Sequence, residues 1–210
     1  MRNKENSRII FEKPKTNDKF ENSTVLFIDR DGVIIEDTHY INDPKKVILC
    51  KGAKKFIRKI YEKNIPIIIV TNQSGISKNL ITWAEYNLVT KAMLDKLEEP
   101  NPITAIYANS SISDMPQTNW RKPNPTMIKT SIRDLNLRFN QSILIGDRKS
   151  DLIAGLRAGI TYLIHVETGY GKVERKKIKE ELNKSDLLKK YKTSKIFFIN
   201  NLNNFPYEIL

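Results

Sequence analysis

The feature that most constrains the fold is an alternation of short apolar runs with amphipathic segments. Residues 24–28 (TVLFI) are β-branched, aliphatic and aromatic, as expected of a strand buried on both faces of a parallel sheet. Apolar residues in the segment 53–61 recur with the spacing of an amphipathic helix, and residues 66–70 (PIIIV) follow as a second strand. These segments predict one β-α-β unit.

The alternation continues to the C-terminus. Helices are expected near residues 82–97, 125–136, 150–158 and 173–190, and strands at 103–107, 142–145, 161–164 and 195–199. This pattern predicts an α/β fold, with a Rossmann-like parallel sheet and helices on both faces. Residues 1–22 are polar without a sustained period, so we expect a polar N-terminal arm before a single domain over residues 23–210.

Composition narrows the classes of partner. No apolar run approaches the roughly 20 residues that cross a bilayer, and the N-terminal segment lacks the apolar stretch of a secretory signal, so we expect a cytoplasmic protein with no membrane partner. The net charge of +12 would attract phosphate-bearing partners. Because lysine is abundant along the whole chain, we interpret this charge first as background composition, and we do not expect a nucleic-acid site. We expect a monomer.

Polar side chains follow the predicted strands. Ligands of parallel sheets bind beyond the carboxyl ends of the strands, so these residues are the first candidates for a site. Asp29 and Asp31 follow the first strand, Thr71 follows the second, and Asp147 follows the strand at 142–145. Two carboxylates two residues apart at a strand end can hold a hard cation through oxygen ligands, and Mg²⁺ suits such a site.

These residue types fit attack on a phosphate ester. A divalent cation reduces the repulsion between an attacking carboxylate and the phosphate. Asp29 would then be the nucleophile, and Asp31 would protonate the leaving oxygen and later accept a proton from water. Thr71 and Lys122 would supply a hydroxyl and a cation to the phosphoryl group. Taken singly, each residue also has a plainer interpretation, as a turn, a strand end or a solvated lysine.

The segments FIDRDGVI, VTNQSG, RKPNP and LIGDRKSD together resemble the four motifs of the haloacid dehalogenase superfamily of phosphatases, over about residues 24–170. They are most similar to the branch of D-glycero-D-manno-heptose 1,7-bisphosphate 7-phosphatases and histidinol-phosphate phosphatases. The resemblance implies a phosphoric monoester hydrolase with an aspartyl-phosphate on Asp29. It also implies that Asp29, the main-chain carbonyl of Asp31, and Asp147 hold Mg²⁺, with Thr71 and Lys122 stabilising the phosphoryl group.

The resemblance also implies a substrate site. The substrate contacts of the branch map to Asp37, Thr38, His39, Tyr40, Asn72, Gln73, Ser74, Arg121 and Arg148. The intervals that hold cap domains elsewhere in the superfamily are occupied by predicted core elements, so we expect no cap domain. Loops near residues 33–49 and 109–120 would then select the substrate.

One departure from the branch concerns zinc. The branch usually carries a zinc loop of cysteines and a histidine, whereas this chain has Ala108, Ser110, Thr118 and Trp120 at those places. Since neither thiolate nor imidazole ligands remain in that segment, no zinc is expected there. We expect Trp120 and Met115 to replace the metal by packing.

The implied substrate is a small phosphorylated sugar. D-glycero-D-manno-heptose 1,7-bisphosphate, cleaved at the 7-phosphate for cell-surface carbohydrate synthesis, is the first candidate. Histidinol phosphate is the nearest alternative. A polynucleotide 3'-phosphatase and a catalytically inactive binding module also stay open, the first because of the basic charge and the second because of the missing zinc loop.

Overall fold

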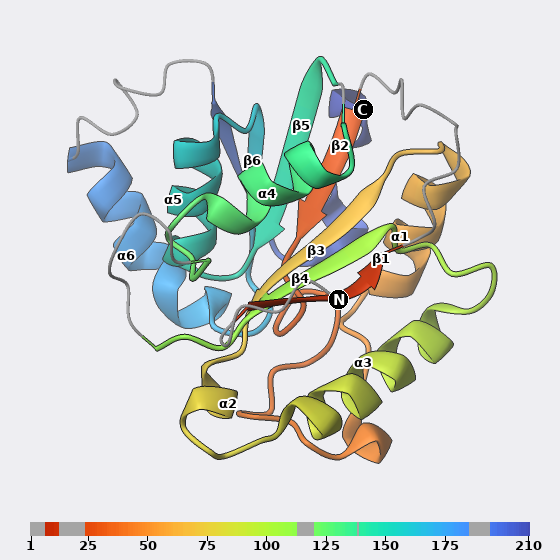
Figure 1. Ribbon diagram of the computed structural model, residues 1–210. Coiled ribbons are helices and arrows are strands. Elements are labelled where there is room, and N and C mark those ends of the chain that lie inside the picture. The colour runs from red at the N-terminus through yellow and green to blue at the C-terminus, as the bar shows by residue number, and fades with distance from the viewer. Residues whose placement is uncertain (1–6, 13–23, 113–119, 138, 185–193) are drawn as a thin grey trace.

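A single mixed sheet organises the part of the chain that the computed structural model describes, which is residues 7–12, 24–112, 120–137, 139–184 and 194–210 (Figure 1). In spatial order its strands are β1 (Ser7–Glu12), β4 (Ala105–Asn109), β3 (Ile67–Asn72), β2 (Thr24–Ile28), β5 (Gln141–Gly146), β6 (Tyr162–Val166) and β7 (Lys195–Ile199). All neighbours are parallel except β1 and β4. The predicted α/β fold is confirmed.

Helices cover both faces of the sheet, as predicted. They are α1 (Ala53–Glu62), α2 (Ser74–Ser77), α3 (Trp83–Leu97), α4 (Thr126–Asp134), α5 (Lys149–Ala158) and α6 (Gly171–Lys184), with short 3-10 turns at Pro44–Lys46, Leu202–Asn204 and Tyr207–Ile209. Alternate residues of β2 point to opposite faces. Leu26 and Ile28 pack in a core with α1, α3 and the C-terminal turns, whereas Val25 and Phe27 pack in a second core with α4, α5 and α6.

The order of the strands creates a crevice at the centre of the sheet. From β2 the chain adds β3 and β4 on one side, and then returns to place β5 on the other side of β2. Such a reversal separates the loops that leave two adjacent strands, and ligands of open α/β sheets bind there. The segments that follow β2 and β5 therefore meet at the carboxyl edge of the sheet, where Asp29 and Asp147 lie.

The N-terminal segment differs from the prediction. Part of the predicted polar arm forms β1, which pairs antiparallel with β4 so that Ser7 lies opposite Asn109. Its apolar run is only three residues long, Ile9 to Phe11, and it becomes a strand only by pairing with a distant edge, which no local pattern reveals. The helix predicted at 173–190 is observed as α6, and its residues beyond 184 lie outside the described part of the chain.

The two intervals that could hold a cap domain contain elements of the core. Within the described chain, the segment between Asp31 and Thr71 contains one 3-10 turn, α1 and the start of β3, and the segment between Thr71 and Lys122 contains α2, α3 and β4. No helix among the described residues is long and apolar enough to span a membrane.

Candidate active site

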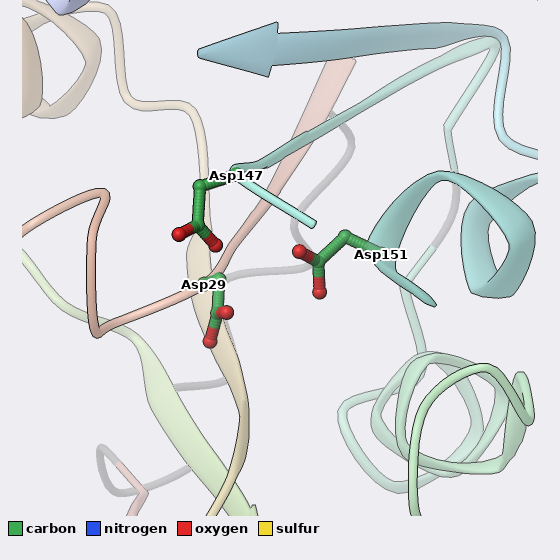
Figure 2. Close-up of side chains that lie close together, drawn as sticks. All are labelled: Asp29, Asp147 and Asp151. Atoms are coloured by element: carbon green, nitrogen blue, oxygen red, sulfur yellow. The ribbon is translucent and has the colours of Figure 1, made fainter. Parts of the chain in front are cut away.

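Three buried carboxylates meet where β2 and β5 end. The main chains of these strands are in register, and the Asp29 amide donates to the carbonyl of Ile145 at 2.9 Å. Asp29 follows β2, Asp147 follows β5, and Asp151 lies in the first turn of α5; one carboxylate oxygen from each lies within 4.8 Å of the others. Figure 2 shows the three carboxyl groups close together. The predicted convergence of Asp29 and Asp147 is observed, whereas Asp151 was not predicted.

Asp147 is held on two sides and leaves one oxygen free of hydrogen bonds. Its Oδ2 accepts from the Tyr170 amide at 2.7 Å. Its Oδ1 is buried and has no hydrogen-bond partner among the described residues. Gly32 and Gly169 both have positive φ, and a Cβ on either would lie 2.4 or 2.3 Å from Oδ2. A buried acceptor without a donor, inside a cluster of carboxylates, fits a divalent cation with oxygen ligands.

Lys122 is the cation of the cluster. Its side chain is buried, and its Nζ lies 3.0 Å from Asp29 Oδ1 and 2.6 Å from Asp151 Oδ1. The same Nζ donates to the carbonyl of Val70 at 2.8 Å. Asn72 fixes the main chain of Lys122, because its side-chain amide donates to the Lys122 carbonyl and accepts from the Lys122 amide, both at 3.0 Å. The lysine of the Arg-Lys-Pro motif therefore lies beside Asp29, as predicted.

Burial and neighbouring charges shift the pKa values of the residues in the cluster. Burial raises the pKa of Asp29 to about 6, although Lys122 acts in the opposite direction. Burial, with the charges of Asp151 and Asp29, raises the pKa of Asp147 to about 9. Burial would lower the pKa of Lys122, but the two neighbouring carboxylates outweigh it and raise that pKa. Ionising all three carboxyl groups beside one ammonium would leave an excess of negative charge, which a bound cation would offset.

Asp31 belongs to a network beside the carboxylate cluster. The buried guanidinium of Arg30 lies 2.9 Å from Asp31 Oδ1, and its centre is 4.4 Å from the centroid of the Tyr86 ring. The Gln73 amide donates to Asp31 Oδ2 at 2.7 Å and to Thr71 Oγ1 at 2.8 Å. Arg30 and Gln73 therefore fix the orientation of the Asp31 carboxylate, and the Thr71 hydroxyl keeps its own proton to donate.

A cavity of about 640 Å³ opens over this cluster. It is lined by most of the residues that the sequence predicted, namely Asp29, Asp31, Asp37, His39, Tyr40, Asn72, Gln73, Ser74, Arg121, Lys122 and Arg148. Thr38 is not among the lining residues, and Thr71 and Asp147 are buried beneath them. The lining also includes Lys78, Ser150 and Tyr170, which the sequence analysis missed.

One side of the cavity mouth joins the loop after β2 to the loop after β6. Arg148 lies 3.6 Å from Asp37, and its guanidinium is stacked 3.5 Å from the centroid of the Tyr170 ring. The Tyr170 hydroxyl lies 3.0 Å from His39 Nδ1, and Asp37 accepts from the His39 amide at 2.9 Å. Arg148 therefore has both a carboxylate and an aromatic partner in the mouth.

Tyr40 forms the other side of the mouth. Its ring rests on Gly75, where an added Cβ would lie 2.4 Å from Tyr40 Cδ1. Lys78 donates to the Tyr40 hydroxyl at 2.7 Å and lowers the pKa of this phenol. Two consecutive residues with positive φ, His39 and Tyr40, turn the loop toward these partners.

The segment that holds zinc elsewhere in the branch is only partly described. Ala108 and Ser110 are buried, and Trp120 packs against Tyr107 with ring centroids 5.6 Å apart. The predicted packing role of Trp120 is thus observed. Thr118 and Met115 lie outside the described residues.

Comparison with known proteins agrees with this geometry. A family model described as HAD-hydrolase-like matches residues 119–189. A heptose-1,7-bisphosphate 7-phosphatase of Photorhabdus laumondii, named for the α-anomer, is 32% identical over 153 residues, which cover 70% of this chain and 84% of the relative. The chain belongs to the haloacid dehalogenase-like phosphatase family. Membership confirms the predicted class of enzyme, a phosphoric monoester hydrolase.

Other members of the family extend the comparison. A heptose-1,7-bisphosphate 7-phosphatase of Mesorhizobium japonicum, named for the β-anomer, is 33% identical over 142 residues, which cover 64% of this chain and only 65% of the relative. The crystal structure of a HAD-like phosphatase from Mesorhizobium loti has a TM-score of 0.68 at 30% identity and covers 77% of this chain and 80% of that one. The structure of D,D-heptose 1,7-bisphosphate phosphatase from B. bronchiseptica, complexed with magnesium and phosphate, also has a TM-score of 0.68, at 23% identity, and covers 86% of this chain and 93% of that one. At that identity it shows the fold alone.

Proposed function

We propose that this protein is a Mg²⁺-dependent phosphatase that removes the 7-phosphate of D-glycero-D-manno-heptose 1,7-bisphosphate. The observation that carries the mechanism is the convergence of Asp29, Asp147, Asp151 and Lys122 at the floor of the cavity. The relatives named above as heptose bisphosphate phosphatases support the substrate. We further propose that the protein acts as a cytoplasmic monomer.

In the proposed first step, a carboxylate oxygen of Asp29 attacks the phosphorus. The bond between phosphorus and the sugar oxygen breaks as the Asp29–phosphorus bond forms, and Asp31 gives its proton to the departing oxygen. Lys122 and the Thr71 hydroxyl stabilise the charge on the phosphoryl oxygens. Arg30 and Gln73 support this role because they hold the Asp31 carboxylate in one orientation.

In the second step, water hydrolyses the aspartyl-phosphate. Asp31 accepts a proton from the attacking water, inorganic phosphate leaves, and the Asp29 carboxylate is regenerated. Mg²⁺, when bound, would be held by Asp29, the main-chain carbonyl of Asp31, and Asp147, and would reduce the repulsion between Asp29 and the phosphate. Oδ1 of Asp147 has no hydrogen-bond partner in the described part of the chain, which supports its assignment as a ligand. Asp151 borders the same space and keeps Lys122 in place.

The experiment that tests this proposal measures phosphate release with Mg²⁺ from heptose 1,7-bisphosphate, histidinol phosphate and a 3'-phosphorylated oligonucleotide. Wild type should prefer the heptose bisphosphate, and Asp29→Asn should lose about a thousandfold or more in rate, because the nucleophile is gone. Asp95→Asn, in an exposed ion pair on α3, is the matched control. Preference for another substrate would keep the mechanism and replace the substrate, whereas full activity of Asp29→Asn would refute the mechanism.

A further inference from the structure

His165 is a buried histidine of β6 that touches the main chain of Asp147. Its side chain is 0% exposed, and its Nε2 lies 2.9 Å from the carbonyl oxygen of Asp147. Arg175 Nε donates to the other ring nitrogen, Nδ1, at 3.4 Å. Because a guanidinium can only donate, Nδ1 is the acceptor, so the hydrogen of the neutral ring lies on Nε2 and points at Asp147.

Arg175 is itself fixed by several partners. From α6 its guanidinium donates to the main-chain carbonyls of His165, at 3.2 Å, and of Ile199. It also lies 3.5 Å from Glu167. The imidazole is therefore oriented by a chain of contacts that joins α6, β6 and β7 to the end of β5.

Asp147 is thus held at two different points. Tyr170 fixes Oδ2 and His165 fixes the main chain, while Oδ1 has no hydrogen-bond partner among the described residues and the carboxyl group lies beside those of Asp29 and Asp151. We infer that His165 is a positioning residue, which sets the main chain of Asp147 so that Oδ1 meets a bound divalent cation. This inference rests on the proposed role of Asp147 as a ligand of Mg²⁺.

A purely structural role makes a different prediction. His165 also packs on Phe198, with ring centroids 5.6 Å apart, so a residue that only fills the core would tolerate any side chain of similar size. A positioning residue requires a donor at the place of Nε2. Glutamine carries an N–H at about that reach and methionine does not, although both are unbranched and similar in length.

The test compares His165→Gln with His165→Met in the full chain. Mg²⁺ affinity is measured without substrate, as the rise of Tm with MgCl2 concentration, and again from the Mg²⁺ dependence of hydrolysis. His165→Met should weaken Mg²⁺ binding about 10-fold or more, as is typical when a residue that orients a ligand is removed. His165→Gln should stay within about threefold of wild type, because it keeps an N–H donor for the carbonyl of Asp147. Leu163→Val, in the same strand and equally buried, controls for loss of core stability.

The outcomes separate the inference from the proposed function. Wild-type affinity in His165→Met would overturn the inference, and so would equal losses in both His165 variants and in Leu163→Val. If instead Asp147→Asn bound Mg²⁺ as tightly as wild type, the proposed ligand would be wrong and the inference would fail with it. A loss confined to His165→Met, with Asp147→Asn also impaired, is the expected result.

Discussion

Without Mg²⁺, the free energy of unfolding should fall as the pH rises above neutrality. The reason is Asp147, whose pKa burial raises from 3.8 to about 9 in the folded state. Between these values the folded protein keeps a proton that the unfolded chain has lost. The contribution of this group is therefore fully present below pH 3.8 and is lost progressively up to about pH 9. One such proton corresponds to about 1.4 kcal/mol per pH unit.

Asp29 contributes at lower pH, because burial raises its pKa only to about 6. Above that value the slope should come mainly from Asp147, so the loss between about pH 6 and pH 8 should be about 2 to 3 kcal/mol. The assay is urea unfolding in EDTA across this range, for wild type and Asp147→Asn. The variant cannot ionise at this position, and subtracting its slope removes the contributions of all other groups.

Mg²⁺ should reverse this dependence. The cation binds the ionised carboxylates of the folded state and competes with their protons, so it stabilises the protein more at higher pH. At about 100 times its dissociation constant the gain would be about 3 kcal/mol. Equal slopes for wild type and Asp147→Asn in EDTA would refute the reasoning, because they would place the titration elsewhere. A Mg²⁺ effect independent of pH would refute it too.

Three further substitutions test individual contacts. Lys122→Met should lower the free energy of unfolding by about 3 to 5 kcal/mol in urea, because it leaves buried carboxylates without their cation, and it should abolish phosphate release. Lys78 lines the cavity and donates to the Tyr40 hydroxyl at its mouth, where its charge would contact the second phosphate of a bisphosphate. Lys78→Gln should therefore raise KM about 10-fold for a sugar bisphosphate but not for the matching monophosphate, with Lys63→Gln at an exposed position as control. Gly75→Ala, which would push on the Tyr40 ring, should raise KM more than it lowers kcat; the opposite split would place Tyr40 in the chemical step.

The sequence was sufficient to predict that Asp29 and Asp147 lie together at the floor of the site. Asp29 and Asp147 each follow a short apolar run of the kind typical of a buried strand, and parallel strands bring their carboxyl ends to one edge. Their meeting therefore needed no knowledge of side-chain packing. The register between β2 and β5 then decides the distance between them, and it comes from the long-range pairing of Ile28 with Ile145.

The residues that sequence reasoning missed depend on contacts between distant loops. Asp151 follows Asp147 by four residues in the first turn of α5, where an acidic residue is ordinary because it interacts favourably with the helix dipole. Its closeness to Asp147 in the sequence, four residues on, was the available signal. Tyr170 reaches Asp147 only through the left-handed turn at Gly169, and β1 exists only by pairing with β4. Neither leaves a periodic pattern in the sequence.

The structure separates the proposed chemistry from the choice of substrate. At the floor, Asp147 is enclosed by Gly32, Gly169, the Tyr170 amide and His165. A substitution at one of these positions would therefore displace the Asp147 carboxyl group, which lies beside Asp29. At the mouth, the loop that carries His39 and Tyr40 contacts Tyr170 and Lys78 through single hydrogen bonds. Substitutions at the mouth can therefore change which phosphate ester is bound while the carboxylate cluster stays intact. The segment after β2 carries Asp29 at the floor and, about ten residues later, His39 and Tyr40 at the mouth, so the loop at the mouth can change in sequence without changing the residues at the floor.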